Sequence, residues 1–362
     1  MKKQLFLGLT LALLGGAIAL QGCSKSDSAA TSTSRNYAGA GSDWRFTLNE
    51  DGTFSGTESE SSSTIAGTYT TTSTGFQRLV VTSSTGAHAP AANTVIPCTE
   101  VPGFAFVCEP VLNTEDQLVG TLVTGTCPSS DFTVNVINMQ FNLNTVDMTK
   151  TTGGFDQGSG SYDGDLFGTF KWTASTGSGT SLTHYVVAGY TQLNPTTPAI
   201  TGTCTNGIMT TTSFNAYLSP TAVVVKVTEA GSPNLGNTIF AMPIQTLGTL
   251  SAVDGTYAGF LYDADATTKI HPITATVSGG ALSVASVSTT DLVTADGAAS
   301  GTATLTAVDS PSAGFIKGTV SGHNLICTAG TNVASSGKSV LFCLGQSPST
   351  PAKPYMVILG SK

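Results

Sequence analysis

The stretch RFTLNEDGTFSG, residues 45–56, decides the fold class. On either side of Asp51-Gly52 lies a short run in which apolar residues alternate with polar ones. Such alternation is typical of a strand with one buried face. An Asp-Gly pair between two such runs predicts a hairpin, because glycine accepts the positive φ that the tight turn requires. The segment therefore predicts two antiparallel strands.

The rest of the chain repeats this pattern, and almost no helical period follows Arg35. Short runs of β-branched and aromatic residues alternate with clusters of Gly, Pro, Asn, Asp and Ser, which is typical of strands and turns. Before residue 245 we expect further strands at 63–72, 78–84, 104–111, 117–125, 132–141, 165–174, 182–190, 199–204, 208–217, 221–228 and 237–244.

The C-terminal part begins after a linker at 245–253 and contains a regular series of short runs. Short strands with short connections suggest a meander that closes into a barrel or a tight sandwich. We therefore predict an all-β protein of antiparallel barrel or sandwich modules, with an N-terminal β-region at 36–250, of one or two modules, and an eight-stranded domain at 251–362. The C-terminal strands are expected at 256–262, 270–277, 281–288, 301–307, 314–321, 324–329, 338–345 and 355–360.

The N-terminus has the build of a secretory signal. A basic head, Met1-Lys2-Lys3, precedes an apolar run that ends in Leu20-Gln21-Gly22-Cys23. This ending resembles the lipobox of bacterial lipoproteins, although Gln21 replaces the usual small residue. The resemblance implies a signal peptide at 1–22, cleavage after Gly22, diacylglycerol on the Cys23 sulfur, and a fatty acid such as palmitate on the new amino group. The alternative is an ordinary cleaved signal followed by a chance cysteine.

The residues after Cys23 bear on localisation. In lipoproteins an aspartate at the next position favours the inner membrane, so the resemblance implies that a chain with Ser24 is anchored in the outer membrane of the cell envelope; the leaflet stays open. Residues 23–35 are small and polar, which predicts a lipidated flexible tether. The membrane is thus one expected partner, reached through the lipid.

Composition excludes one class of partner. Charged residues make up 10% of the chain, and the net charge is -8; ordinary domains have about 25% charged residues. A negative chain does not bind nucleic acid through its phosphates, nor an anionic membrane by simple attraction. We expect no nucleic-acid partner, and an envelope protein, a glycan or a small molecule remains open.

The cysteines predict a disulfide framework, as is usual for exported proteins. Once Cys23 is assigned to lipid, an even number remains; the alternative is reduced, buried thiols. Two pairs flank turn signals, one at Pro102-Gly103 and one at 334–337, and we expect each pair to bridge a hairpin. The pairing of the other two stays open. The cysteines are Cys98 and Cys108, Cys327 and Cys343, and the unassigned Cys127 and Cys204.

Two weaker patterns concern the modules. Gly-Thr-aromatic recurs at 67–69, 168–170 and 255–257, which suggests duplicated modules, or only the frequent start of a strand. The opening Asp43-Trp44-Arg45-Phe46, with the hairpin and strand after it, is loosely similar to lipocalin-like β-barrel modules of exported bacterial proteins. That similarity covers about forty residues and implies a small barrel without carrying over any ligand site.

One stretch of the sequence resembles a phosphate-binding motif only in part. Residues 330–339 end in Gly-Lys-Ser like a phosphate-binding loop, but Asn332 stands where that motif needs glycine, and the next residues predict a strand rather than a helix. We interpret this stretch as a hairpin loop. No Gly-x-Ser-x-Gly elbow is present, so the α/β-hydrolase signature is absent.

The remaining polar groups point to no metal or cofactor. His88, His184, His271 and His323 are far apart and lack zinc spacing, although a fold could still assemble a Ser-His-Asp site from distant residues. Clustered aspartates could coordinate Ca²⁺ or form a solvated loop, and the loop is the better interpretation. They are Asp156, Asp163 and Asp165, with a weaker pair at Asp263 and Asp265.

From the sequence we therefore expect a membrane-anchored lipoprotein with a non-enzymatic binding or structural role. The alternatives are a lipocalin-like carrier of a small apolar ligand and an exported hydrolase with a dispersed site. Trp44 and Trp172 are expected in the core rather than in a sugar platform.

Overall fold

The all-β prediction is confirmed by a computed structural model. It describes residues 34–362 except 41–43, 59–60, 110–117, 124, 143–165, 188, 194–199, 202, 211–213, 219–222, 229–234, 264–269 and 348–353. Within these residues the helices are two short 3-10 turns, η1 (Leu250–Val253) and η2 (Val333–Ser335). The strands form three sheets, which belong to one compact unit.

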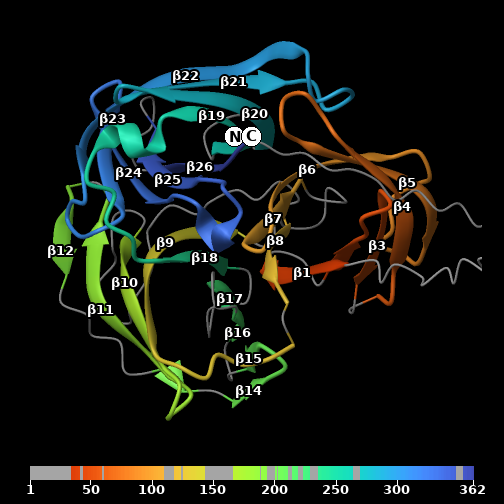
Figure 1. Ribbon diagram of the computed structural model, residues 1–362, viewed down its shortest axis with the longest axis horizontal. Coiled ribbons are helices and arrows are strands. Elements are labelled where there is room, and N and C mark those ends of the chain that lie inside the picture. Colours follow the sequence, from red (N-terminus) through yellow and green to blue (C-terminus); the bar gives the residue numbers. More distant parts are fainter. Residues whose placement is uncertain are drawn as a thin grey trace, which may run out of the picture. The chain divides into compact units, whose positions relative to one another are not determined.

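The first sheet is a closed antiparallel barrel in which β1 pairs with both β2 and β8 (Figure 1). The expected hairpin joins β2 to β3, with Gly52 at a φ of +81° and its N–H donating to the carbonyl of Asn49 at 3.1 Å. The strands are β1 (Arg35–Ala40), β2 (Trp44–Leu48), β3 (Thr53–Glu58), β4 (Thr64–Thr71), β5 (Gln77–Thr85), β6 (Val95–Val101), β7 (Ala105–Cys108) and β8 (Leu118–Leu122).

The last sheet is a second closed barrel of eight strands, in which β19 pairs with β20 and β26 (Figure 1). Every strand neighbours the next one along the chain, so the barrel is an up-and-down meander without exposed edges. The strands are β19 (Gly255–Asp263), β20 (Ile270–Ser278), β21 (Ala281–Val287), β22 (Ala295–Val308), β23 (Phe315–Val320), β24 (His323–Gly330), β25 (Val340–Gln346) and β26 (Pro354–Ser361).

The middle sheet follows the order β12-β11-β10-β9-β18-β17-β16-β15-β14, with β13 also paired to β11. The short strands β12 and β13 both pair with β11, and β14 pairs with β15. The strands are β9 (Phe132–Asn142), β10 (Leu166–Thr173), β11 (Ser178–Val186), β12 (Thr191–Leu193), β13 (Ile200–Thr201), β14 (Thr203–Thr205), β15 (Ile208–Thr210), β16 (Phe214–Leu218), β17 (Val223–Thr228) and β18 (Leu235–Pro243).

The interiors of the two closed barrels are filled by their own side chains. In the first barrel the inward residues of β3 alternate with exposed ones, and a Cβ on inward Gly56 would lie 2.8 Å from Ile65 and 3.3 Å from Trp44. In the last barrel the ring of Tyr355 lies where a Cβ on Gly345 would be. Interiors so close-packed that a methyl group does not fit at these points enclose no space there for a ligand.

A third apolar cluster covers the outside of the last barrel. Its outward residues pack with residues of the first barrel and of the middle sheet. Three aromatic pairs make these contacts, with ring centroids 5.9, 6.2 and 5.4 Å apart. They are Phe76 with Phe260, Phe104 with Phe342, and Phe167 with Phe315.

Three disulfides are present, and the two hairpin pairs are those that the sequence predicted. Cys98 faces Cys108 across β6 and β7, and Cys327 faces Cys343 across β24 and β25. In both barrels these are the sixth and seventh strands, so the two barrels share the position of the bond. The Gly-Thr-aromatic stretches lie instead in the fourth, second and first strands of their sheets, β4, β10 and β19, and are not equivalent.

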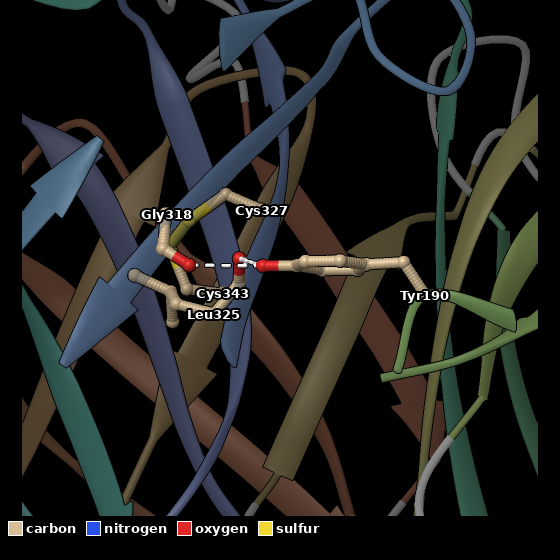
Figure 2. The surroundings of a disulfide bond; sticks show 5 residues. All are labelled: Tyr190, Gly318, Leu325, Cys327 and Cys343. Atoms are coloured by element: carbon tan, nitrogen blue, oxygen red, sulfur yellow. Dashed lines mark hydrogen bonds between the residues drawn. A yellow bond between two sulfur atoms is a disulfide. The ribbon is translucent and has the colours of Figure 1, made fainter. Parts of the chain in front are cut away.

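Figure 2 shows the surroundings of the Cys327–Cys343 bond. The hydroxyl of Tyr190, from the segment between β11 and β12, donates to the carbonyl oxygens of Gly318 and Leu325 at 2.9 and 2.8 Å. These carbonyls lie on β23 and β24, whose pairing joins Gly318 to Leu325. One tyrosine thus connects the middle sheet to the last barrel at its disulfide.

Candidate functional site

Several residues singled out from the sequence lie outside the described residues. These are the lipidation site Cys23 with the signal and the tether up to residue 33, and the acidic residues Asp156, Asp163, Asp165 and Asp265. The tether expected at 23–35 is shorter, because β1 begins at Arg35. Asp263 is described and ends β19. In the part of the chain that the structure describes, neither helix is long or apolar enough to cross a bilayer. Among the same residues, no three His, Cys, Asp or Glu side chains gather as a metal site requires.

The stretch at 330–339 forms a hairpin loop. β24 ends at Gly330 and β25 begins at Val340, with η2 between them. The carboxamide oxygen of Asn332 accepts the N–H of Gly337 at 2.7 Å and so braces the loop. A phosphate-binding loop needs a helix whose amino end faces the anion, and here a strand follows.

One end of the first barrel carries a Ser/His/carboxylate cluster. Glu58 ends β3 on the inward face, Ser61 and Ser63 lie in the connection to β4, and His88 lies in the connection from β5 to β6. The Glu58 side chain is 1% exposed and the His88 side chain 35%. The meander brings these two connections to the same end of the barrel, which explains why residues thirty positions apart meet.

The Glu58 carboxylate is the centre of this cluster. One of its oxygens, Oε2, accepts the hydroxyl of Ser61, accepts the backbone N–H of Ser61 at 2.8 Å, and lies 3.4 Å from Nδ1 of His88. The Ser61 hydroxyl is also 2.6 Å from that of Ser63, which accepts the backbone N–H of His88 at 2.9 Å. The two serine hydroxyls therefore form hydrogen bonds with the carboxylate, with each other and with the backbone.

The opposite end of the first barrel holds a buried ion pair. Glu100, on the inward face of β6, accepts Nε of Arg35 at 2.5 Å and Nη2 at 3.1 Å on its two oxygens. The Tyr37 hydroxyl donates to the same carboxylate at 2.8 Å. Burial, and secondarily the Glu100 charge, raises the pKa of Tyr37, whereas the hydrogen bond to Glu100 raises the pKa of Arg35. The network keeps a charged carboxylate satisfied inside the barrel.

A second Ser/His/carboxylate group lies at one end of the last barrel. The Ser286 hydroxyl, on β21, donates to Asp296 on β22 and accepts the backbone N–H of Ala299 at 2.8 Å. The hydrogen bond from Ser286 is the largest cause that lowers the pKa of Asp296, with a smaller contribution from the charge of His271 on β20. Ser286 is 1% exposed.

The connectivity of both groups differs from that of a nucleophilic triad. A triad places histidine between serine and carboxylate, so that the imidazole can take the serine proton. In the first group the Glu58 carboxylate lies between Ser61 and His88, and in the second group the Ser286 hydroxyl donates directly to Asp296. A carboxylate bonded to a serine hydroxyl braces the loop and does not activate the oxygen as a nucleophile. The described contacts of these groups therefore favour a structural role.

The histidines and tryptophans occupy separate places. His88 belongs to the first barrel, His184 to β11, and His271 and His323 to the last barrel. Burial lowers the pKa of His184. Trp44 and Trp172 are 0% and 2% exposed, so both are core residues, as expected.

Comparison of the chain with known protein families, with curated proteins and with solved structures finds no match. The function is therefore inferred from the sequence and structure of this chain alone. Sequence reasoning missed the Glu58 cluster and the Arg35–Glu100 pair. A signal was present: Glu58 follows the inward positions Phe54 and Gly56. A carboxylate at an inward position needs a partner.

Substitution of Glu109 tests how burial affects a carboxyl group after β7. Burial raises its pKa from 4.5 to about 7. The folded state thus holds this proton more tightly than the unfolded state, and the native protein loses stability as the pH rises from about 4.5 to about 7. Glu109→Gln should raise stability near pH 8 by up to about 3 kcal/mol and leave it unchanged near pH 4. Thermal unfolding at both pH values measures this, and an equal effect at both would exclude the titration.

Proposed function

We propose that this chain is a lipid-anchored protein of the bacterial outer membrane with a non-enzymatic binding or structural role. The anchor is argued from the Leu20-Gln21-Gly22-Cys23 motif after an apolar run. A single acyl chain holds a protein only marginally, whereas the two or three chains of a lipoprotein cysteine give a stable anchor. The residues between Cys23 and Arg35, where β1 begins, would separate the β-body from the bilayer.

The single observation that carries the non-enzymatic role is the filling of the two closed barrels. In the core of the first barrel the rings of Trp44, Phe54 and Phe106 each contact the ring of Phe46. A lipocalin-like carrier holds its ligand at that place. Filled barrels tied by disulfides favour a durable body that presents its loops to a partner, an envelope protein or a glycan.

The hydrolase alternative receives less support than the binding role. It needs a histidine between a serine and a carboxylate, whereas in both groups the serine hydroxyl donates directly to the carboxylate. No observation favours it over the binding role. The absence of a Gly-x-Ser-x-Gly elbow agrees with this choice.

Replacing Cys23 tests the anchor and the role together. Cys23→Ser should abolish labelling by a palmitate analogue and move the protein from the detergent phase to the aqueous phase, because the acylated sulfur is gone. The matched control, Ser24→Ala, leaves the motif intact and should label normally. The purified serine variant should carry no stoichiometric apolar ligand in native mass spectrometry. Persistent labelling would refute the anchor, and a bound apolar ligand would favour the carrier.

A further inference from the structure

The middle sheet has a seam at the short strands β13 and β14, which lie on either side of residue 202. Among the described residues, β13 contributes two residue pairs to β11, and β14 contributes three to β15. By contrast, β18 and β9 share nine pairs. The described parts of β13 and β14 are therefore held by few residue pairs.

The Cys127–Cys204 disulfide lies at this seam. Cys204 is the central residue of β14, opposite Met209, and Cys127 precedes β9 by a few residues. The bond joins the edge strand β14 to the chain entering β9, with a Cα–Cα distance of 6.0 Å. The turn from β14 to β15 also lies against the segment that enters β9, since a Cβ on Gly207 would be 3.3 Å from the Thr126 carbonyl oxygen.

The environment of this bond differs from that of the other two disulfides. All four cysteines of the barrel disulfides are 0% exposed within the barrel cores. Cys127 and Cys204 are both partly exposed. Thiol–disulfide exchange requires a thiolate to reach a sulfur atom, so access decides which bond reacts in the folded protein.

An apolar cluster lies beneath the seam. It contains Val134, Trp172, Met209, Leu218 and Ala241, and Cys204 packs against it. Its members come from strands β9, β10, β15, β16 and β18. Trp172 is 2% exposed, and its indole N–H has no hydrogen-bond partner. Movement of β14 away from β9 would change the solvent around this indole.

We propose that Cys127–Cys204 is a reducible clasp that holds the seam of the middle sheet closed. A thiolate of a dithiol reductant attacks one sulfur, the second cysteine leaves as a thiolate, and a mixed disulfide forms. The second thiolate of the reductant then attacks the mixed disulfide, releases the first cysteine and becomes a disulfide itself. Two electrons pass to the protein, and its two sulfurs take up protons. The reduced seam opens at β13 and β14 and uncovers the apolar cluster.

The test uses the purified full chain and dithiothreitol under native conditions. Iodoacetamide labelling followed by peptide mapping should modify Cys127 and Cys204 at least about tenfold faster than the four barrel cysteines, which react only after local unfolding. In a Trp44→Phe variant, where Trp172 is the one tryptophan, the emission should move to longer wavelength as labelling proceeds. Amide exchange should increase in β13 and β14 and stay slow in β19–β26.

Two outcomes would overturn the clasp. Equal labelling rates for all three disulfides would show that this bond is not selectively accessible. Selective labelling with unchanged Trp172 emission and unchanged exchange in β14 would show that the bond does not hold the seam. The double variant Cys127→Ser/Cys204→Ser should reproduce the reduced state without reductant. If that variant does not fold, the reduced and alkylated natural chain gives the same two measurements.

Discussion

Arg35→Met is expected to lower the free energy of unfolding of the first barrel by about 3–5 kcal/mol, the usual cost of removing one partner of a buried ion pair. The Glu100 side chain is 2% exposed, against 27% for Arg35. Loss of the guanidinium therefore leaves the Glu100 carboxylate inside the barrel with the Tyr37 hydroxyl at 2.8 Å and the Gln77 side-chain amide at 3.5 Å as described partners. Urea unfolding followed by Trp44 emission, in a Trp172→Phe background, reports on this barrel alone.

A second substitution separates charge from packing. Arg35→Met/Glu100→Gln removes the charge and should recover more than half of the loss. Arg35→Lys keeps the charge without the two-point contact. Its free energy of unfolding should lie between those of the natural chain and Arg35→Met. Equal losses in the single and double variants would mean that the ion pair contributes nothing.

Local sequence patterns predicted much of the architecture. Alternation and turn residues identified most strands of the last barrel, since each strand there neighbours the next. The same logic placed Cys98 opposite Cys108 and Cys327 opposite Cys343, because a cysteine pair that flanks a tight turn is brought together by the turn. Such inferences are reliable in a meander, because each strand pairs with the next strand along the sequence.

Elements that depend on tertiary context were wrong or missed. β6 is absent from the expected strands, although the expected Cys98–Cys108 hairpin implies a strand there; Pro97 lies within it, and proline is unfavourable in a strand. β22 begins at Ala295 rather than at 301, in a stretch of Ala, Gly and Ser with low strand propensity. The expected strand 208–217 is divided into β15 and β16, which pair with each other, whereas the expected strand 199–204 coincides with β13 and β14 on either side of residue 202. Ser286 bonded to Asp296 holds the early part of β22 against β21.

The polar clusters were beyond sequence reasoning for a different reason. Arg35 and Glu100 are 65 positions apart, and which inward residues of a barrel meet depends on the register of strands between them. The outer apolar cluster was missed for a similar reason, because it joins residues that are far apart in the sequence. Outward strand positions of the last barrel, such as Phe260 and Phe342, lie against other parts of the chain.

This cluster corrects one expectation about the segment 251–362. The sequence suggested that separation at 250 would break few contacts, because the segment has its own core and its own disulfide. The core is present, and the barrel is closed. Its outer face, however, buries apolar residues against the first barrel and the middle sheet; they include Phe260, Phe315, Phe342, Met356 and Ile358.

The isolated segment 251–362 is therefore expected to fold as a β-domain and to self-associate. Each uncovered phenylalanine loses about 2 kcal/mol of burial, which other exposed apolar faces can restore. Circular dichroism should give a β-type spectrum with a cooperative transition, and light scattering should give a mass above that of a monomer. Phe260→Thr/Phe342→Thr should reduce the association.

Neighbouring residues on opposite faces of β23 supply the control. Phe315→Thr changes the outer cluster and should lower association without unfolding the segment, whereas Ile316→Thr changes the barrel core and should unfold it. Both residues are fully buried in the full chain, so burial alone does not distinguish them. If the natural segment folds cooperatively and stays monomeric, the outer face is stable in water without the first barrel and the middle sheet against it. A disordered segment would mean that the closed barrel depends on the rest of the chain.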